Sequence, residues 1–144
     1  MSRAFSSTFK RLPMPSAFLM VQDAPLSGVQ LSVPFLARLA QEIPQVDYLK
    51  VEMPGTADKL RALIGAAGDS IAGPFDGEES ITLMPDLDAG ATGTMCSALL
   101  PELIKDVVTR HARGDRAGAK AAYAHILPLI NFENRQCGFR ACKT

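Results

Sequence analysis

VDYLKVE, residues Val46 to Glu52, is a short run of β-forming residues that ends before Pro54 and Gly55, a pair that stops a strand. Because side chains alternate along a strand, Lys50 and Glu52 are expected on the same face. Both lie at the carboxyl end of this strand, where barrel enzymes build their active sites. The run therefore predicts a strand that presents an amine beside a carboxylate.

On both sides of this strand, short apolar runs alternate with segments of helical period, which is the pattern of repeated β-α units and a parallel sheet. The other strands are expected at 17–22, 70–73 and 90–95. Helices are expected over 32–43, 56–65 and 78–89, with PFDG (74–77) as a loop before the last of them. Four β-α units are thus predicted.

Two amphipathic segments, 102–113 and 116–130, follow this region and predict a helical tail. They are joined at Gly114 and Asp115, a helix stop followed by an N-cap. The predicted organisation is a poorly assigned N-terminal remnant (1–14), four β-α units (15–100) and a helical tail (101–144).

Composition excludes several classes of protein. The chain has 144 residues, 47% of them hydrophobic and 21% charged, and its 15 basic and 15 acidic residues give no net charge. No basic patch suggests nucleic acid, and no apolar run reaches the roughly 18 residues that span a membrane. The three cysteines, Cys96, Cys137 and Cys142, form no CxxC pair, which favours reduced thiols in a cytoplasmic protein. The Ser-rich, basic first dozen residues are expected to be a helix remnant or the result of a displaced start codon, with a transit peptide as the alternative.

Three motifs occur in order: QDAP (22–25), YLKVE (48–52) and GATGTM (90–95). With the helical tail, they resemble the dihydrodipicolinate synthase and N-acetylneuraminate lyase superfamily from about residue 15 to the end of the chain. The resemblance implies an α/β fold, the C-terminal half of a (β/α)8 TIM barrel (strands five to eight) followed by helices. It also implies that Lys50 forms a Schiff base with a small 2-keto acid, without any cofactor or metal. A lysine inside a packed barrel loses hydration, and its amine can then attack a carbonyl. The alternative is a lysine that extends from the strand end to water.

Departures from the superfamily pattern narrow the reaction. Gln22 replaces the tyrosine of the YNxP motif and cannot relay a proton as a phenol does, so an aldolase or a dihydrodipicolinate-synthase-type reaction is the less favoured alternative. QDAPLSG, KVEMPG, GPFDGEE, GATGTM and LPLINFENRQ resemble the branch that dehydrates 2-keto-3-deoxy-L-arabonate to 2-oxoglutarate semialdehyde. Glu52 is the candidate acid and base of this dehydration. Its alternative role is a salt bridge that only keeps Lys50 charged.

Further residues are candidates for substrate binding or are expected to be structural. The substrate-binding candidates are Gln22, Asp23, Gly73, Asp76, Gly93 and Thr94. Asp76 is alternatively part of a turn, and the glycine of GATGTM alternatively marks tight packing. A solvated helix end is favoured for residues 133–135, and both histidines, His111 and His125, are expected to be structural.

The superfamily's first four strands and its GTTGE-like carboxylate turn are not found in this sequence. The expected explanations are a truncated gene product, one piece of a split enzyme, or an expression fragment. A four-stranded sheet with open edges invites association, so a second copy or a complementary barrel half is the expected partner. A non-catalytic fragment or interaction module remains the third hypothesis for function.

Overall fold

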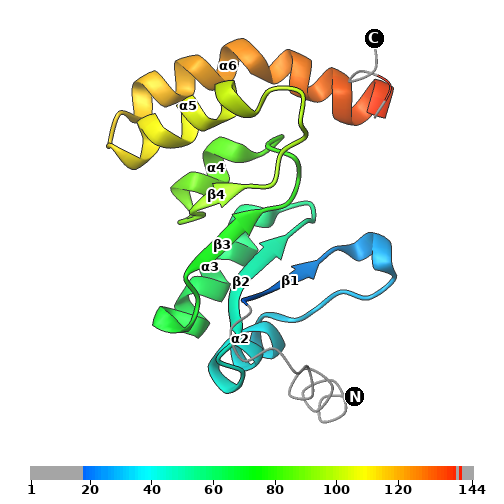
Figure 1. The fold of residues 1–144 in the computed structure, drawn as a ribbon, viewed down its shortest axis with the longest axis vertical. Helices are drawn as coiled ribbons and strands as arrows, with labels where there is room; N and C mark the ends of the chain where they lie inside the picture. Colours follow the sequence, from blue (N-terminus) through cyan, green and yellow to red (C-terminus); the bar gives the residue numbers. More distant parts are fainter. Residues whose placement is uncertain (1–17, 139, 141–144) are drawn as a thin grey trace.

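The computed structural model describes residues 18–138 and 140, so the predicted N-terminal remnant (1–14) lies outside the described residues. Four parallel strands form one sheet whose spatial order follows the chain (Figure 1). They are β1 (Leu19–Asp23), β2 (Val46–Val51), β3 (Gly73–Asp76) and β4 (Gly93–Thr94). A parallel sheet that runs in chain order is the arrangement of a β/α barrel, whereas a doubly wound sheet reverses its order.

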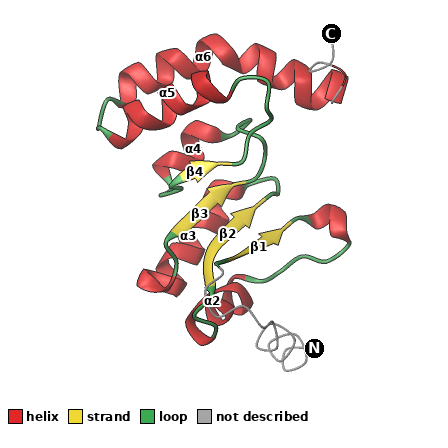
Figure 2. Cartoon of the chain, viewed as in Figure 1, coloured by secondary structure: helices red, strands yellow, loops and turns green. Residues whose placement is uncertain are grey.

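Helices return the chain between the strands and cover one face of the sheet. They are α2 (Val33–Glu42), α3 (Thr56–Ala67) and α4 (Leu83–Asp88). Figure 2 shows α3 behind β2 and β3. Ser32 caps α2 by accepting a hydrogen bond from the backbone N–H of Phe35, as its position before the helix predicts. The core lies between these helices and the sheet, and its fully buried members include Leu36, Leu39, Leu49, Val51, Leu60 and Leu63.

The opposite face of the sheet carries aromatic side chains and is not covered by any described helix. Phe18 is 73% exposed, and its ring meets that of Tyr48 edge-on, with the centroids 6.2 Å apart. Tyr48 in turn contacts Phe75, at 6.0 Å between centroids. In a closed barrel, this face is the one that points to the interior.

The predicted position of the third strand was wrong. Residues 68–70 form a 3-10 turn, and the strand is Gly73–Asp76, so PFD belongs to the strand and not to a loop. Gly73, Pro74 and Asp76 have low β-propensity, but the ladder with β2 begins at the pair of Tyr48 with Gly73 and continues to Asp76. Tertiary pairing therefore overrides the local preference, because it satisfies backbone groups that would otherwise be buried without partners.

The segment that follows β3 also differs from its prediction. The helix begins at Leu83 instead of residue 78, because Glu79 and Ser80 adopt positive φ angles of 53° and 71° that no helix can contain. The last strand is limited to Gly93–Thr94, within the predicted range of 90–95. The boundaries of the other strands and helices lie within about two residues of their predictions, as is usual for element ends.

The helical tail forms as predicted and packs back on the β-α units (Figure 1). It consists of α5 (Pro101–Ala112) and α6 (Arg116–Phe132). Gly114 has a φ of 82° at the corner, and Asp115 caps α6 by accepting a hydrogen bond of 2.9 Å from the N–H of Gly118. His111 contacts Asp88 at 2.9 Å, which agrees with its predicted structural role. Within the described part of the chain, no helix is long and apolar enough to cross a membrane.

The tail ends in a π-helix, η3 (Glu133–Cys137), where a solvated helix end was expected. That expectation was wrong for Glu133, which is 5% exposed and accepts a hydrogen bond of 2.6 Å from Ser97. A carboxylate needs such a donor when it leaves water. The π-helix is therefore packed against the loop that follows β4.

Candidate active site

Lys50 and Glu52 lie together at the carboxyl end of β2, on the face that the helices do not cover. The Nζ atom of Lys50 is 3.1 Å from Oε2 of Glu52, so the expectation that they share a face is confirmed. Gln22, on the neighbouring strand, donates a hydrogen bond of 2.6 Å from Nε2 to the same oxygen. The sheet fixes this arrangement, because β1 and β2 pair Gln22 with Lys50 and the N–H of Glu52 bonds to the carbonyl of Asp23 at 2.9 Å.

Gly77 packs directly against this pair. Its N–H bonds to the carbonyl of Val51 at 2.8 Å, which extends the β2–β3 ladder past the end of both strands. A Cβ atom at residue 77 would lie 2.8 Å from Cβ of Glu52 and 3.0 Å from Cε of Lys50. Real Cβ contacts are essentially never shorter than 3.0 Å. Only glycine therefore lets the β3–α4 loop (residues 77–82) approach the amine and its carboxylate so closely.

Asp23 points away from Lys50, into the layer between sheet and helices. It is 1% exposed, forms an ion pair with Lys59 of α3, and accepts a hydrogen bond of 2.9 Å from the N–H of Leu31. Lys59 also donates to the carbonyl of Leu31 at 2.5 Å. Alternation along β1 explains this position, since Gln22 takes the uncovered face. Asp23 thus holds the loop between β1 and α2, and its placement gives no support to the predicted contact with substrate.

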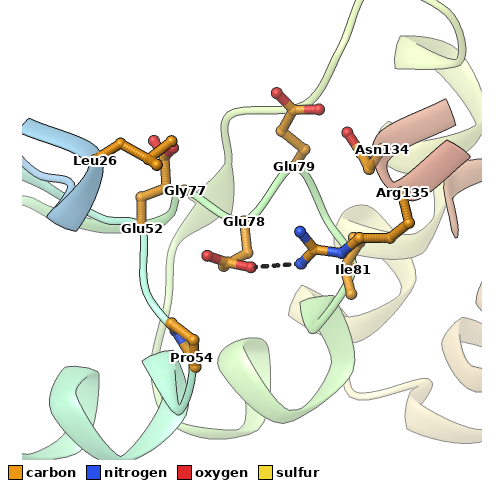
Figure 3. A pocket seen from close by; sticks show the side chains of 9 residues that line it. All are labelled: Leu26, Glu52, Pro54, Gly77, Glu78, Glu79, Ile81, Asn134 and Arg135. Carbon is orange, nitrogen blue, oxygen red and sulfur yellow. Dashed lines mark hydrogen bonds and ion pairs between the residues drawn. The ribbon is translucent and has the colours of Figure 1, made fainter. Parts of the chain in front are cut away.

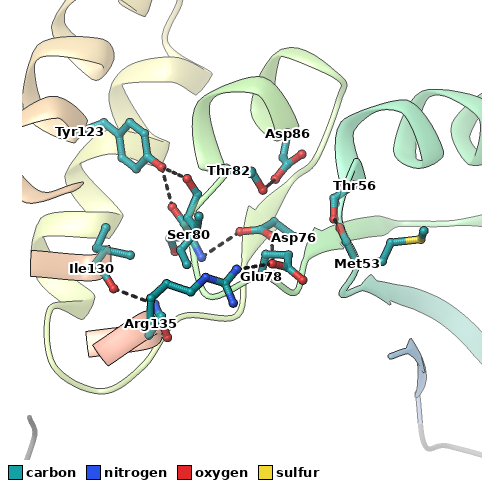
Figure 4. A network of polar contacts seen from close by, with 12 residues as sticks. Met53, Thr56, Asp76, Glu78, Ser80, Thr82, Asp86, Tyr123, Ile130 and Arg135 are labelled. Carbon is teal, nitrogen blue, oxygen red and sulfur yellow. Dashed lines mark hydrogen bonds and ion pairs between the residues drawn. The ribbon is translucent and has the colours of Figure 1, made fainter. Parts of the chain in front are cut away.

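Asp76 and its ladder partner Thr94 also lie on the helix side, where they organise the β3–α4 loop. Figure 4 shows Asp76 beside Glu78 and Ser80 of that loop. Asp76 is fully buried and accepts hydrogen bonds from the N–H groups of Glu78 (2.7 Å) and Ser80 (3.1 Å). It accepts a third from Oγ1 of Thr94, at 2.7 Å. Burial raises the pKa of the Asp76 carboxyl, although these three hydrogen bonds act against the rise. Asp76 and Thr94 therefore hold the β3–α4 loop from the helix side of the sheet and do not face Lys50.

The tail holds the same loop from the other side. Oη of Tyr123, on α6, donates hydrogen bonds to the carbonyls of Ser80, at 2.8 Å, and Ile81 (Figure 4). Burial raises the pKa of Tyr123 to about 12, so its hydroxyl stays a donor at neutral pH. Arg135, on the π-helix, forms an ion pair of 3.0 Å with Glu78. The positive φ angles of Glu79 and Ser80 are thus imposed by contacts on both sides, as strained residues near functional sites usually are.

The two strand glycines that were predicted to contact substrate pack against aromatic rings. A Cβ atom at Gly73 would lie 2.7 Å from the ring of Phe75 and 2.8 Å from that of Tyr48. Gly73 was expected as the last residue of the third strand but is the first residue of β3, at the end far from Glu52, so its placement gives no support to the predicted contact with substrate. Gly93 does lie on the face of Lys50, paired with Phe75, and a Cβ atom there would come within 3.1 Å of the same ring.

A cavity of about 480 Å³ opens beside Glu52 (Figure 3). Its lining comes from the β1–α2 loop, the end of β2, the β3–α4 loop and the π-helix. The residues are Leu26, Glu52, Pro54, Gly77, Glu78, Glu79, Ile81, Asn134 and Arg135. Lys50 is not among them, but Glu52 and Gly77, which both contact it, form one wall. A volume of this size suits a small organic ligand.

The electrostatics of the cavity are dominated by carboxylates. Burial raises the pKa of the Glu79 carboxyl, and the charges of Glu133 and Glu52 raise it further. The charges of Lys50 and Arg135 act in the opposite direction. The described residues contain no cluster of three or more side chains able to hold a metal ion. What the arrangement offers is an amine nucleophile next to carboxylates that can accept and donate protons.

Sequence reasoning missed several residues that build this cavity. Glu78 and Glu79 stand in the quoted motif GPFDGEE, and Asn134 and Arg135 stand in LPLINFENRQ. The motifs were the only available signal, since 55 residues lie between the end of the first motif and Arg135, too far for any local rule to join them. Leu26 likewise stands in a quoted motif, QDAPLSG, whereas Tyr123, which holds the β3–α4 loop, lies in no quoted motif and gave no signal.

No family model matches the chain. The chain is 54% identical, over 125 residues, to the L-2-keto-3-deoxyarabonate dehydratase of Azospirillum brasilense. The match covers 87% of this chain and 40% of that dehydratase. The resemblance expected from the motifs is therefore confirmed in sequence, over less than half of the relative's length.

Solved structures of dihydrodipicolinate synthases share the fold. The Acinetobacter baumannii synthase, which is chloride-inhibited and complexed with pyruvate, matches with a TM-score of 0.83 at 22% identity, over 99% of this chain and 49% of its own. The Aquifex aeolicus synthase gives a TM-score of 0.83 at 20% identity, over 96% and 47%. The Rhodopseudomonas palustris synthase gives 0.80 at 23% identity, over 94% and 48%. The fold is thus the C-terminal half of a TIM barrel followed by helices, as predicted.

Proposed function

We propose that this chain is the lysine-bearing half of a Schiff-base hydro-lyase that dehydrates a 2-keto-3-deoxy sugar acid, with 2-keto-3-deoxy-L-arabonate as the substrate. The observation that carries the proposal is the contact of 3.1 Å between Lys50 and Glu52 at the carboxyl end of β2, on the face that points into a barrel. The 54% identity to a dehydratase named for that substrate supports the choice of reaction.

The reaction begins with attack of the Lys50 amine on the C2 carbonyl, and loss of water from the carbinolamine gives an iminium ion. The iminium acidifies C3, and Glu52 takes the C3 proton to leave an enamine. The nitrogen lone pair then re-forms the iminium as the C4–O bond breaks, and the hydroxyl leaves as water. Tautomerisation and hydrolysis release 2-oxoglutarate semialdehyde and the free lysine.

Gln22 supports a dehydratase in preference to an aldolase. Its amide donates to Glu52 at 2.6 Å and holds the carboxylate beside Lys50. An amide does not exchange a proton at neutral pH as a phenol or carboxyl group does, so it is unsuited to relaying protons in carbon–carbon bond cleavage. Product analysis separates the two reactions, because dehydration yields the semialdehyde and retro-aldol cleavage yields pyruvate.

The barrel is completed, in this proposal, by a complementary half or by a second copy of the chain, and the enzyme works in the cytoplasm. The aromatic face, which no described helix covers, and the edge of β1, which pairs with no further strand among residues 18–138, support association. The superfamily's carboxylate turn, absent from this sequence, would come from the complementary half.

Borohydride trapping tests the proposal. The chain is incubated with 2-keto-3-deoxy-L-arabonate or with pyruvate, reduced and digested with trypsin. An adduct on Lys50 blocks cleavage there and gives an intact peptide from Leu39 to Lys59, whereas Lys50→Arg keeps the charge and should give no adduct. Absence of an adduct from the folded wild-type chain, with and without the complementary half, would refute the proposal and favour a non-catalytic fragment.

A further inference from the structure

Three glutamates line the cavity, and two of them are already engaged. Glu52 receives the Gln22 amide at 2.6 Å and the Lys50 ammonium at 3.1 Å, both on Oε2. Glu78 receives the Arg135 guanidinium at 3.0 Å. A carboxylate surrounded by donors acts as an acceptor. Glu52 is therefore suited to take a proton from C3, but not to deliver a second proton to the leaving hydroxyl.

Glu79 is the remaining carboxyl group. Within the described residues it makes no hydrogen bond and no ion pair, and it lies exposed on the rim of the cavity. In the view of Figure 3 it stands between Glu52 on one side and Asn134 and Arg135 on the other. It has room to approach a ligand that occupies the cavity.

The backbone holds Glu79 in this position at a cost. Its φ angle is 53°, and the next residue, Ser80, has a φ of 71°. Two consecutive non-glycine residues with positive φ angles are unusual, and both are strained. Asp76 and Tyr123 fix the residues on either side, so the strain persists in the folded chain. The side chain is consequently presented to the cavity from a backbone that hydrogen bonds hold on both sides.

The surroundings of Glu79 favour its protonated form. Partial burial of the carboxyl is the main cause of its raised pKa, and the negative charges of Glu133 on the π-helix and of Glu52 raise it further. Lys50 and Arg135 oppose them to a smaller extent. General acid catalysis requires a carboxyl group that can hold a proton until the leaving group takes it, and the raised pKa of Glu79 acts in that direction.

We propose that Glu79 is the general acid of the dehydration, which donates its proton to the C4 hydroxyl while Glu52 takes the proton from C3. This inference rests on the proposed function. In the step itself, the nitrogen lone pair of the enamine forms C2=N, the C2=C3 pair forms C3=C4, and the C4–O pair leaves with the oxygen. The oxygen takes the Glu79 proton and departs as water. Glu52 later releases its proton to solvent and Glu79 regains one, so the site is reset without any other reactant.

Mass spectrometry of the trapped adduct shows whether the bound sugar acid has lost water. It therefore distinguishes imine formation from dehydration in a single turnover. Wild type, Glu79→Gln and a matched control, Glu102→Gln on the exposed surface of α5, are mixed with 2-keto-3-deoxy-L-arabonate and quenched with borohydride at increasing times. Each is also trapped with pyruvate, which reports on Lys50 without any elimination step. The complementary half is supplied wherever the wild-type chain needs it.

We expect wild type and Glu102→Gln to accumulate an adduct lighter by one water. Glu79→Gln should trap pyruvate as the wild type does but carry the intact sugar acid, with dehydration slowed at least about 100-fold. Dehydration at the wild-type rate in Glu79→Gln would overturn the inference and leave the proposed function standing. Loss of pyruvate trapping in Glu79→Gln would also overturn it, since Glu79 would then support the lysine and not the leaving group. If the wild type itself gives no adduct, the proposed function fails, and the role of Glu79 fails with it.

Discussion

Replacement of Gly77 by alanine tests whether close approach of the β3–α4 loop builds the site. The added Cβ atom would lie 2.8 Å from Cβ of Glu52, 2.9 Å from the carbonyl oxygen of Val51 and 3.0 Å from Cε of Lys50. The Lys50 side chain can move, but the Val51 carbonyl belongs to the sheet and accepts the Gly77 N–H at 2.8 Å. Forcing one methyl group into such a contact costs about 1–3 kcal/mol. The loop must therefore shift, and Glu52 must shift with it.

A second glycine gives the matched control. Gly65 lies within α3 and is exposed, and a Cβ atom built there meets nothing within 4 Å. Alanine in the interior of a helix is favoured over glycine by roughly 0.5–1 kcal/mol, so Gly65→Ala should stabilise the chain. The same chemical change is thus expected to have opposite signs at the two positions.

Urea unfolding followed by circular dichroism measures the free energy of unfolding of both variants, and borohydride trapping with pyruvate measures the site. We expect Gly77→Ala to lose about 1–3 kcal/mol and most of its Lys50 adduct. Gly65→Ala should gain stability and trap normally. A Gly77→Ala variant as stable as the wild type, with an unchanged adduct, would show that the loop tolerates the methyl group and that close packing on Lys50 is unimportant.

Three further predictions follow from buried polar groups. Lys59→Met leaves the carboxylate of Asp23 buried without its cation and should lower the free energy of unfolding by about 3–5 kcal/mol in a urea titration. Lys120→Met, on the exposed side of α6, is the control and should change the free energy of unfolding little. Tyr123→Phe removes the donor to two backbone carbonyls of the β3–α4 loop and should cost about 1–3 kcal/mol; unaltered stability and hydrogen exchange in that loop would contradict this. Burial raises the pKa of Asp86 from 3.8 to about 6, so the folded chain binds this proton more tightly than the unfolded chain and stability from this group falls as pH rises from about 4 to about 6. Urea titrations at pH 4 and pH 7 should show a loss of about 2 kcal/mol that Asp86→Asn largely removes, and an equal loss in both proteins would exclude Asp86 as its source.

The prediction for Asp86 follows from its surroundings on α4. The residue is fully buried, one carboxylate oxygen accepts a hydrogen bond of 2.6 Å from Thr82, and the other has no partner within the described residues. An ionised carboxylate in that position lacks the donors that would replace water. Protonation relieves this cost, which explains why the folded state holds the proton at a higher pH than the unfolded state.

The central pair of the site, Lys50 and Glu52, could be predicted from local sequence. Alternation along VDYLKVE places Lys50 and Glu52 on one face, and the helical periods predict the helices between the strands. These inferences hold because the repeat of a strand or helix is a property of the backbone, independent of what packs against it. The helix corner at Gly114 and Asp115 was predictable for the same reason, since cap and turn residues act within a few positions of themselves.

Pairing between strands could not be predicted in the same way. Gly73, Pro74 and Asp76 have the local preferences of a loop, yet they form β3, because the ladders with β2 and β4 are available on both sides. The side of the sheet on which Asp23 lies was also missed. A motif match does not say which face of a strand a residue takes when the start of the strand is uncertain.

What the sequence determined by itself is therefore the order of the β-α units, the face shared by Lys50 and Glu52, and the relationship to a dehydratase. Only the tertiary structure decided that Asp23 and Asp76 are buried supports, and that Glu79 and Arg135 reach the same cavity as Glu52. The physical reason is distance along the chain. Arg135 meets Glu78 across 57 positions, and such a contact depends on how the tail packs against the sheet, which no local preference of the backbone encodes.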